Sequence, residues 1–288
     1  MKKSQWIAMG AAVLLTGGIF IFGRTVPRKK PIVVEEHGPD DGHNHENEAG
    51  AVTIDTLLIL AKKQLTTDQL VRINTLENSI TRGDVEQQQL HVYHQLARFW
   101  ADSAHAFEPY AWYTAEAARL ENSEKNLTFA AHLFLENLQA DEVVQRRQWK
   151  AVQAKDLFER SLKINPSNDS AKVGLGACYL FGNISSNPME GILKIREVAE
   201  KDSNNTYAQF MLAKGSVLSG QYDKAISRLE SVNRMRPADI DAILLLAEVY
   251  ERTNNKDKAV QWYEKSLPFI KQAELRKAIA ERIVELKK

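Results

Sequence analysis

Apolar residues recur at three- and four-residue intervals from about Thr53 to the end of the chain, in the manner of amphipathic helices. Polar segments rich in glycine, asparagine or proline separate these apolar stripes. No stretch alternates convincingly as a β-strand would, so the pattern predicts an all-α fold. The first helices begin near Thr53, Thr66 and Asp84. The later ones are expected at 107–120, 123–139, 141–164, 168–182, 188–201, 204–219, 222–235, 238–253 and 256–270.

A fixed spacing relates the helices of the C-terminal half. Ala213 is followed twelve positions later by Ala225, and Ala247 is followed at the same interval by Ala259. Small residues at both positions allow two helices to approach closely, and Pro237 stops the second helix because proline cannot continue it. The two alanine pairs begin 34 positions apart. A period of this length is typical of stacked helical repeats.

Less regular units precede these two. The steps between Ala97, Ala131, Gly176, Ala213 and Ala247 are 34, 45, 37 and 34 positions long. The long step holds 11 extra residues, about three helical turns, so we expect a lengthened hairpin there rather than a loop. A further turn is inserted around residues 183–187. The positions that define the repeats are Ala97, Ala131, Ala154, Gly176, Tyr179, Ala213, Ala225, Pro237, Ala247, Tyr250, Ala259 and Tyr263.

This pattern resembles the tetratricopeptide repeat, a helix–turn–helix unit of roughly 34 residues. The resemblance implies a right-handed superhelical solenoid over residues 53–288, with about six helix pairs and a capping helix at 272–287. The best repeats are 169–205, 206–239 and 240–273, and residues 53–168 form degenerate ones.

In that family the first helix of each pair lines a groove that binds extended or helical segments of other proteins. Carried over by position, the groove residues expected here are Val173, Tyr207, Phe210, Lys214, Val217, Asp241, Leu244, Glu248 and Glu251. One subgroup holds a C-terminal carboxylate with asparagines, but Lys214 and Glu248 occupy those key positions, which argues against that mode.

An uncharged apolar run fills residues 4–23, behind Lys2 and Lys3. Twenty helical residues span about 30 Å, the thickness of a bilayer core. Since no small-x-small cleavage pattern ends the run and basic residues follow at once, residues 1–23 are expected to be an uncleaved transmembrane anchor rather than a signal peptide. This style of anchor suggests the inner membrane of a bacterium. The flanking charges favour a cytoplasmic domain, whereas the two lysines of the short N-terminal tail resist export, and an extracytoplasmic domain is the preferred prediction.

Residues 24–52 have the composition of a linker, basic at first and then rich in histidine and acidic residues. The simplest interpretation is a solvated spacer. The alternative is loose capture of a transition metal by His37, His43 and His45.

The net charge and the motif content of the sequence limit the classes of function to consider. The net charge of +1 argues against a nucleic-acid binder, and the single cysteine, Cys178, lies in an apolar helix and is expected to be a buried structural thiol. No phosphate-binding, hydrolase, zinc-protease or redox motif is present. We therefore expect no enzyme, no cofactor and no small-molecule substrate.

The leading hypothesis is a membrane-tethered scaffold or adaptor that binds a segment of another protein during envelope protein assembly or export. The alternative hypothesis is a metal-handling protein that uses the histidine-rich linker.

Overall fold

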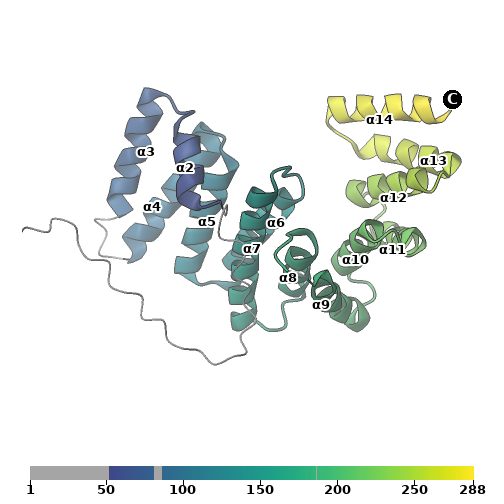
Figure 1. Cartoon of the computed structure of the whole chain (residues 1–288), viewed down its shortest axis with the longest axis horizontal. Coiled ribbons are helices and arrows are strands. Elements are labelled where there is room, and N and C mark those ends of the chain that lie inside the picture. The colour runs from purple at the N-terminus through teal and green to yellow at the C-terminus, as the bar shows by residue number, and fades with distance from the viewer. Residues whose placement is uncertain (1–51, 81–85, 186) are drawn as a thin grey trace, which may run out of the picture. The chain divides into compact units, whose positions relative to one another are not determined.

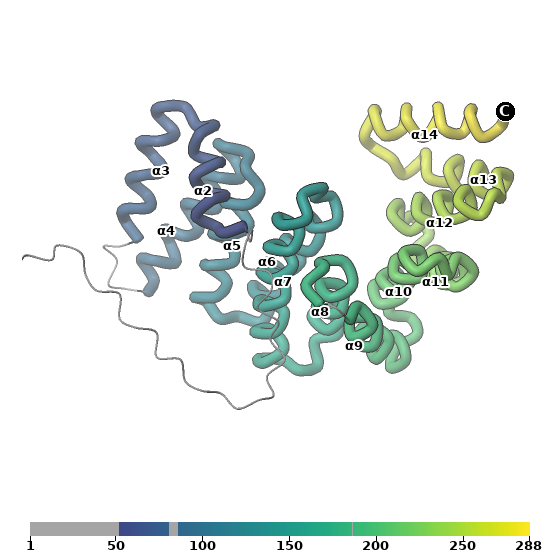
Figure 2. The backbone as a smooth tube through the Cα atoms, in the orientation of Figure 1, coloured from purple at the N-terminus to yellow at the C-terminus, as the bar shows by residue number. Residues whose placement is uncertain are grey.

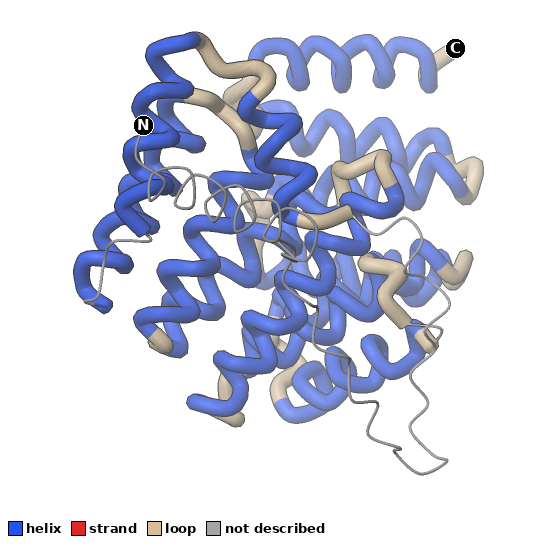
Figure 3. Tube along the Cα trace, turned by 60° about the vertical axis from the view of Figure 1, so that its left-hand side comes forward, coloured by secondary structure: helices blue, strands red, loops and turns tan. Residues whose placement is uncertain are grey.

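The computed structural model describes residues 52–80, 86–185 and 187–288, and within these ranges all regular secondary structure is helical (Figure 3). The expected anchor at 1–23 and the linker as far as residue 51 lie outside them. Among the described helices, none is both long and apolar enough to cross a membrane. The elements are α2 (Ile54–Lys62), α3 (Thr67–Ile80), α4 (Glu86–Arg98) with a π-helical end (Phe99–Ser103), α5 (Phe107–Glu121), α6 (Glu124–Leu138), α7 (Val144–Ile164), α8 (Asp169–Phe181), α9 (Pro188–Lys201), α10 (Thr206–Leu218), α11 (Tyr222–Met235), α12 (Ile240–Arg252), α13 (Lys256–Ser266), a short 3-10 turn (Leu267–Phe269) and α14 (Ala273–Leu286).

Consecutive helices pair into hairpins that pack one against the next (Figures 1 and 2). The hairpins are α4–α5, α6–α7, α8–α9, α10–α11 and α12–α13, and α14 packs on α13 after the last of them. Ahead of the first hairpin, α2 packs on α5 and α3 on α4. The all-α prediction is therefore confirmed for the described residues, as are five of the roughly six expected helix pairs. The expected first pair does not form a hairpin of the same kind, because α2 and α3 pack mainly on α5 and α4.

The hairpins share a capping pattern at the start of their first helices. Ser123, Asn168, Asn205 and Asp239 each accept a hydrogen bond from the backbone N–H three residues later. Such a cap satisfies a helix N–H that has no partner within the helix. The steps between these caps are 45, 37 and 34 positions, like those between the small residues from Ala131 to Ala247. The four units from α6 onward thus begin at the same point of their structure, even where the sequence period is irregular.

The turns between paired helices repeat in the same way. Asn183, Gly220 and Asn254 each adopt a left-handed backbone, with φ of 52°, 71° and 57°. Glycine and asparagine tolerate this conformation better than other residues. These turn residues follow one another at the same intervals as the capping residues Asn168, Asn205 and Asp239.

Small residues at the repeat-defining positions bring the two helices of a hairpin together. Gly176 of α8 faces Gly191 of α9 so closely that neither position has room for a Cβ atom. Alanines occupy the equivalent contacts of α10–α11 and α12–α13, where they are fully buried. Of the repeat-defining residues, only Tyr179 and Pro237 are not buried, because Tyr179 is half-exposed and Pro237 lies on the surface between hairpins.

The 11-residue insertion lengthens the α6–α7 hairpin. α7 has 21 residues, the most of any described helix, and the rest of the insertion forms the connection before it. A buried charged cluster holds this connection in place. The Lys150 ammonium lies 2.6 Å from a carboxylate oxygen of Asp141 and 2.8 Å from Glu108 of α5, while Arg146 also donates to Asp141. The start of α7 is therefore fixed against both α5 and the end of α6.

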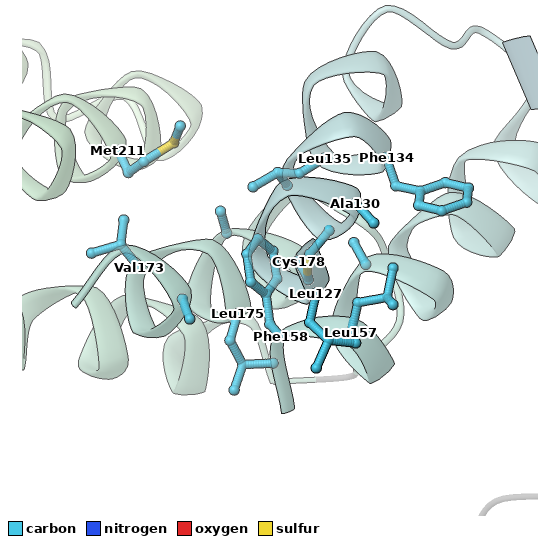
Figure 4. Close-up of a cluster of buried hydrophobic side chains, with 14 of the residues drawn as sticks. Leu127, Ala130, Phe134, Leu135, Leu157, Phe158, Val173, Leu175, Cys178 and Met211 are labelled. Carbon is cyan, nitrogen blue, oxygen red and sulfur yellow. The ribbon is translucent and has the colours of Figure 1, made fainter. Parts of the chain in front are cut away.

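Cys178 lies in the largest apolar cluster, among Leu127, Leu157 and Phe158 (Figure 4). Its side chain is fully buried, which confirms the predicted structural thiol. Burial raises the pKa of the thiol far above its ordinary value, because a thiolate would lack solvation there.

Candidate protein-binding surface

The first helices of successive hairpins contact one another directly: α8 touches both α6 and α10. On α10, Tyr207, Phe210, Lys214 and Val217 follow each other at intervals of three or four residues, so they share one helix face. All four side chains are partly exposed. The groove prediction for α10 therefore corresponds to one continuous, partly accessible row.

Tyr207 closes one end of this row against α6. Its ring lies 5.5 Å from the ring of His132, and His132 in turn shares a 2.9 Å hydrogen bond with the hydroxyl of Ser170. The Tyr207 hydroxyl is buried and has no hydrogen-bond partner within the described residues. Burial raises the pKa of Tyr207 and lowers that of His132, since in both cases the charged form loses solvation.

Lys214 lies further along the row, between aromatic rings. Its ammonium is 5.6 Å from the ring centroids of both Phe181 and Phe210 and donates a hydrogen bond to the side chain of Gln139. Burial lowers the pKa of Lys214, and the neighbouring carboxylates of Asp241 and Glu248 act in the opposite direction. The structure thus brings together residues that the sequence had assigned to the groove.

A pocket of about 280 Å³ opens beside this ammonium. Its lining comes from α7, α8, α10 and α12 and from Gln139, which directly follows α6. We call it the Lys214 pocket and define it by Gln139, Arg147, Leu180, Phe181, Lys214, Val217, Leu218 and Leu245. Five of the eight lining residues are aliphatic or aromatic and three are polar, a mixture that is usual for a ligand site.

The other groove residues have varied surroundings on α12. Asp241 is exposed, and Leu244 packs at the edge of the C-terminal apolar cluster. Glu248 accepts a hydrogen bond of 2.5 Å from Arg252. Glu251 accepts from Arg282 of α14 and, at 3.2 Å, from the Tyr263 hydroxyl. Glu251 therefore joins the last helix to the hairpin before it and is engaged within the fold.

Val173 requires a correction. The sequence register placed it on the groove, but its side chain is fully buried in the main apolar cluster. α8 packs against α6, α7, α9 and α10, and Val173 has no accessible surface. It packs the core and offers nothing to a ligand.

The sequence reasoning missed Arg147 and the buried cluster that positions it. Arg147 follows Arg146, which is held by Asp141, and lines the pocket at the start of α7. The only signal was the three basic residues of the insertion, Arg146, Arg147 and Lys150, near the start of that helix. The partners of Arg146 and Lys150 are Asp141 in the connection before α7 and Glu108 of α5, and the spacing of the basic residues did not identify them.

Two other kinds of functional site, a second surface hollow and a metal site, have less support. A larger open hollow of about 610 Å³ between α13 and the end of α14 is lined mainly by charged and polar side chains. Across the described ranges, no three histidine, cysteine or acidic side chains are grouped so as to hold a metal ion. The metal candidates His37, His43 and His45 lie outside those ranges.

Comparison with known proteins bears on these hairpins. Residues 216–281 match the sequence pattern of the tetratricopeptide repeat family, from the end of α10 through α13 into α14. Residues 216–281 therefore carry tetratricopeptide repeats. Repeats of this family typically form non-catalytic scaffolds for protein–protein interaction. No curated protein matches the chain in sequence.

Several solved structures of tetratricopeptide repeat proteins resemble it. A repeat protein from Parabacteroides merdae has a TM-score of 0.52 at 13% identity, covering 80% of this chain and 84% of its own. TTC0263 of Thermus thermophilus has a TM-score of 0.50 at 15% identity, covering 70% of this chain and 98% of its own. YrrB, described as having an unusual peptide-binding site, has a TM-score of 0.40 at 18% identity, covering 72% of this chain and 97% of its own. The first two of these likenesses support the fold described above.

Proposed function

We propose that this protein is a membrane-tethered adaptor that binds a segment of another protein at the Lys214 pocket and the adjoining row on α10. The observation that carries the proposal is the pocket itself. It has an apolar wall, a partly buried ammonium and an exposed leucine, Leu218, which is 65% accessible. Apolar anchors beside a few placed polar groups are what dominate binding in protein interfaces.

The tether rests on the uncharged run at residues 4–23, which is long enough to span a bilayer as a helix. An anchor of this kind holds the repeats at the bacterial inner membrane, with the repeat domain outside the cytoplasm. A partner in envelope protein assembly or export fits that position. The adaptor has no catalytic role in this proposal, since its contribution is to hold two proteins together.

Photocrosslinking in intact cells tests the binding surface. A photoreactive residue replaces Leu218 in the full-length chain, and the matched control replaces Leu193 of α9, which is also exposed, at 54%, but lies outside the pocket lining. The expected result is one envelope protein captured from position 218 and not from 193. Capture should disappear in Val217→Asp, which places a charge on the apolar wall. Equal capture from both positions, or capture that survives Val217→Asp, would reject the pocket as the binding surface.

The tether is tested separately by membrane fractionation. The full-length chain is expected to stay with the membrane after alkaline carbonate extraction, while a chain without residues 1–23 is expected in the soluble fraction. Accessibility of the repeat domain to protease in spheroplasts then reports its side. A full-length chain that carbonate releases would overturn the anchor.

A further inference from the structure

Two cations line the Lys214 pocket without a counter-ion. The pocket lining contains Arg147 and Lys214 and no carboxylate. Neither cation forms an ion pair with any described residue, although neighbouring Arg146 is held by both Asp141 and Glu108. The carboxylates of Asp241 and Glu248 act on Lys214 from outside the lining, but neither forms an ion pair with it. A partly buried charge without an ion-pair partner is costly, so this arrangement favours a ligand that brings a negative charge into the pocket.

Of the two cations, Arg147 gives the stronger indication of an anionic ligand. Its Nε atom is buried and has no hydrogen-bond partner within the described part of the chain. A buried polar atom that lacks a partner is uncommon and costs stability. The guanidinium group is a planar fork whose N–H groups match the two oxygens of a carboxylate. The buried cluster at the start of α7 fixes the helix turn from which this side chain extends.

The ammonium of Lys214 has N–H donors that make no hydrogen bond within the described residues. One N–H of its ammonium goes to Gln139, and the aromatic rings of Phe181 and Phe210 flank it without accepting a conventional hydrogen bond. The nearest acidic residues lie outside the lining, and Glu248 is already engaged by Arg252. An anion that enters the pocket can therefore approach both cations with no carboxylate of the lining to repel it.

The apolar part of the pocket lining indicates which kind of residue lies next to the anionic group in the ligand. Leu180, Val217, Leu218 and Leu245 provide an aliphatic surface next to the two cations. We propose that the Lys214 pocket binds an acidic side chain of a partner protein, glutamate or aspartate, that is adjacent to a bulky apolar residue within an extended segment. Because Leu218 at the edge is exposed, the pocket is open and the bound chain can continue past it. The proposal rests on the proposed function, since it takes this pocket to be where the partner segment binds.

Peptide selection on the full-length protein tests the specificity. The probe is a random peptide library displayed with the C-terminus of each peptide covalently linked, so that no free terminal carboxylate is offered. Selected sequences are expected to share glutamate or aspartate next to leucine, isoleucine, valine or an aromatic residue. Replacing the acidic residue of a selected peptide by its amide should weaken binding about tenfold or more, since hydrogen bonds to charged groups are the stronger kind.

Variants of the protein provide the matched comparison. Arg147→Gln and Lys214→Met should each weaken binding of the acidic peptide about tenfold. Binding of the amide form of the peptide should stay nearly unchanged. Lys163→Gln removes one positive charge from an exposed position of the same helix, outside the pocket, and should change neither. The three variants are first shown to unfold at the same temperature as the parent chain.

The outcomes separate this proposal from the function on which it rests. Selected peptides that share apolar residues but no acid, and that bind Arg147→Gln normally, would overturn the acidic specificity and keep the peptide-binding function. Failure to select any peptide would instead count against the function itself. Tighter binding after deletion of the chain's own acidic segment, residues 35–48, would assign the pocket to that segment and overturn the proposal, as would an acid requirement met only by a free C-terminus.

Discussion

A Cβ atom on Gly176 would lie 2.6 Å from the carbonyl oxygen of Gly191. The backbones of α8 and α9 are therefore in contact at this point, closer than alanine would allow. Gly176 stands where the other units carry Ala213 and Ala247, and its partner Gly191 comes fifteen positions later instead of twelve. The contact between α8 and α9 thus depends on glycine at both positions.

Gly176→Ala should therefore destabilise the protein by about 2 kcal/mol, since the added methyl group forces the helices apart. Thermal or urea unfolding followed by circular dichroism measures the change. Gly215→Ala is the matched control, because its Cβ would meet only the flexible end of Leu180, at 3.0 Å, and alanine favours the helix. If both variants unfold like the parent, the close contact of α8 and α9 does not exist.

Asp141→Asn should cost about 3 kcal/mol, because it removes one charge from a buried cluster and leaves Lys150 with fewer partners. Asp156→Asn is the comparison within α7. Its ion pairs with Arg119 and Arg160 are partly exposed and should contribute no more than about 1 kcal/mol. Equal effects of the two substitutions on the free energy of unfolding would contradict the buried character of the Asp141 cluster.

The same carboxylate makes stability depend on pH. Hydrogen bonds from Arg146 and Lys150 lower the pKa of Asp141 against the opposing effect of its burial. Its stabilising contribution is complete above the unfolded pKa of about 3.9 and declines as the pH falls below that value towards the lowered folded pKa. Urea unfolding from about pH 6 to about pH 3 should show this decline. Asp141→Asn should reduce its slope, and an unchanged slope would show that other carboxylates account for it.

Cys178 should be inert in the folded protein and reactive once the chain unfolds. It is the only cysteine of the sequence, it is fully buried, and its raised pKa keeps it protonated at neutral pH. Labelling with a thiol reagent in buffer and in concentrated denaturant measures both states. Fast labelling of the native protein would place this thiol at the surface.

Ala247→Trp should unfold the C-terminal hairpins, because Ala247 is fully buried between α12 and its neighbours and the added volume has no room. Ala238→Trp, at an exposed position before α12, should leave the melting temperature nearly unchanged. A stable, cooperative Ala247→Trp protein would show that the repeat register is misplaced.

Much of the fold could be predicted from local pattern. Ala213, Ala225, Ala247 and Ala259 mark helix contacts in the sequence because only small residues fit there, and all four are fully buried. The lengthened α6–α7 hairpin was expected from the 11-residue insertion and is seen in the length of α7. The recurring caps at Asn168, Asn205 and Asp239 were equally visible in the sequence, although the small residues alone had defined the period.

The candidate site was predicted less completely. Position within the repeat identified Tyr207, Phe210, Lys214 and Val217 as a row, because residues three or four apart share a helix face. It also assigned Val173 of α8 to the groove, because a helical period cannot tell which face the neighbouring helices cover. Arg147 was missed, since it reaches the pocket from the second helix of an earlier hairpin.

The sequence by itself determined the helices, their pairing into hairpins and the residues at which paired helices touch, since these depend on interactions within a few tens of residues. Only the tertiary structure decided which polar and charged side chains from distant parts of the chain meet. Lys214 and Gln139 are 75 residues apart, and Lys150 finds Glu108 42 positions earlier in the chain. Such pairs depend on how successive hairpins stack. The stacking brings Arg147 and Lys214 into one pocket without an acidic partner, and no period in the sequence encodes that arrangement.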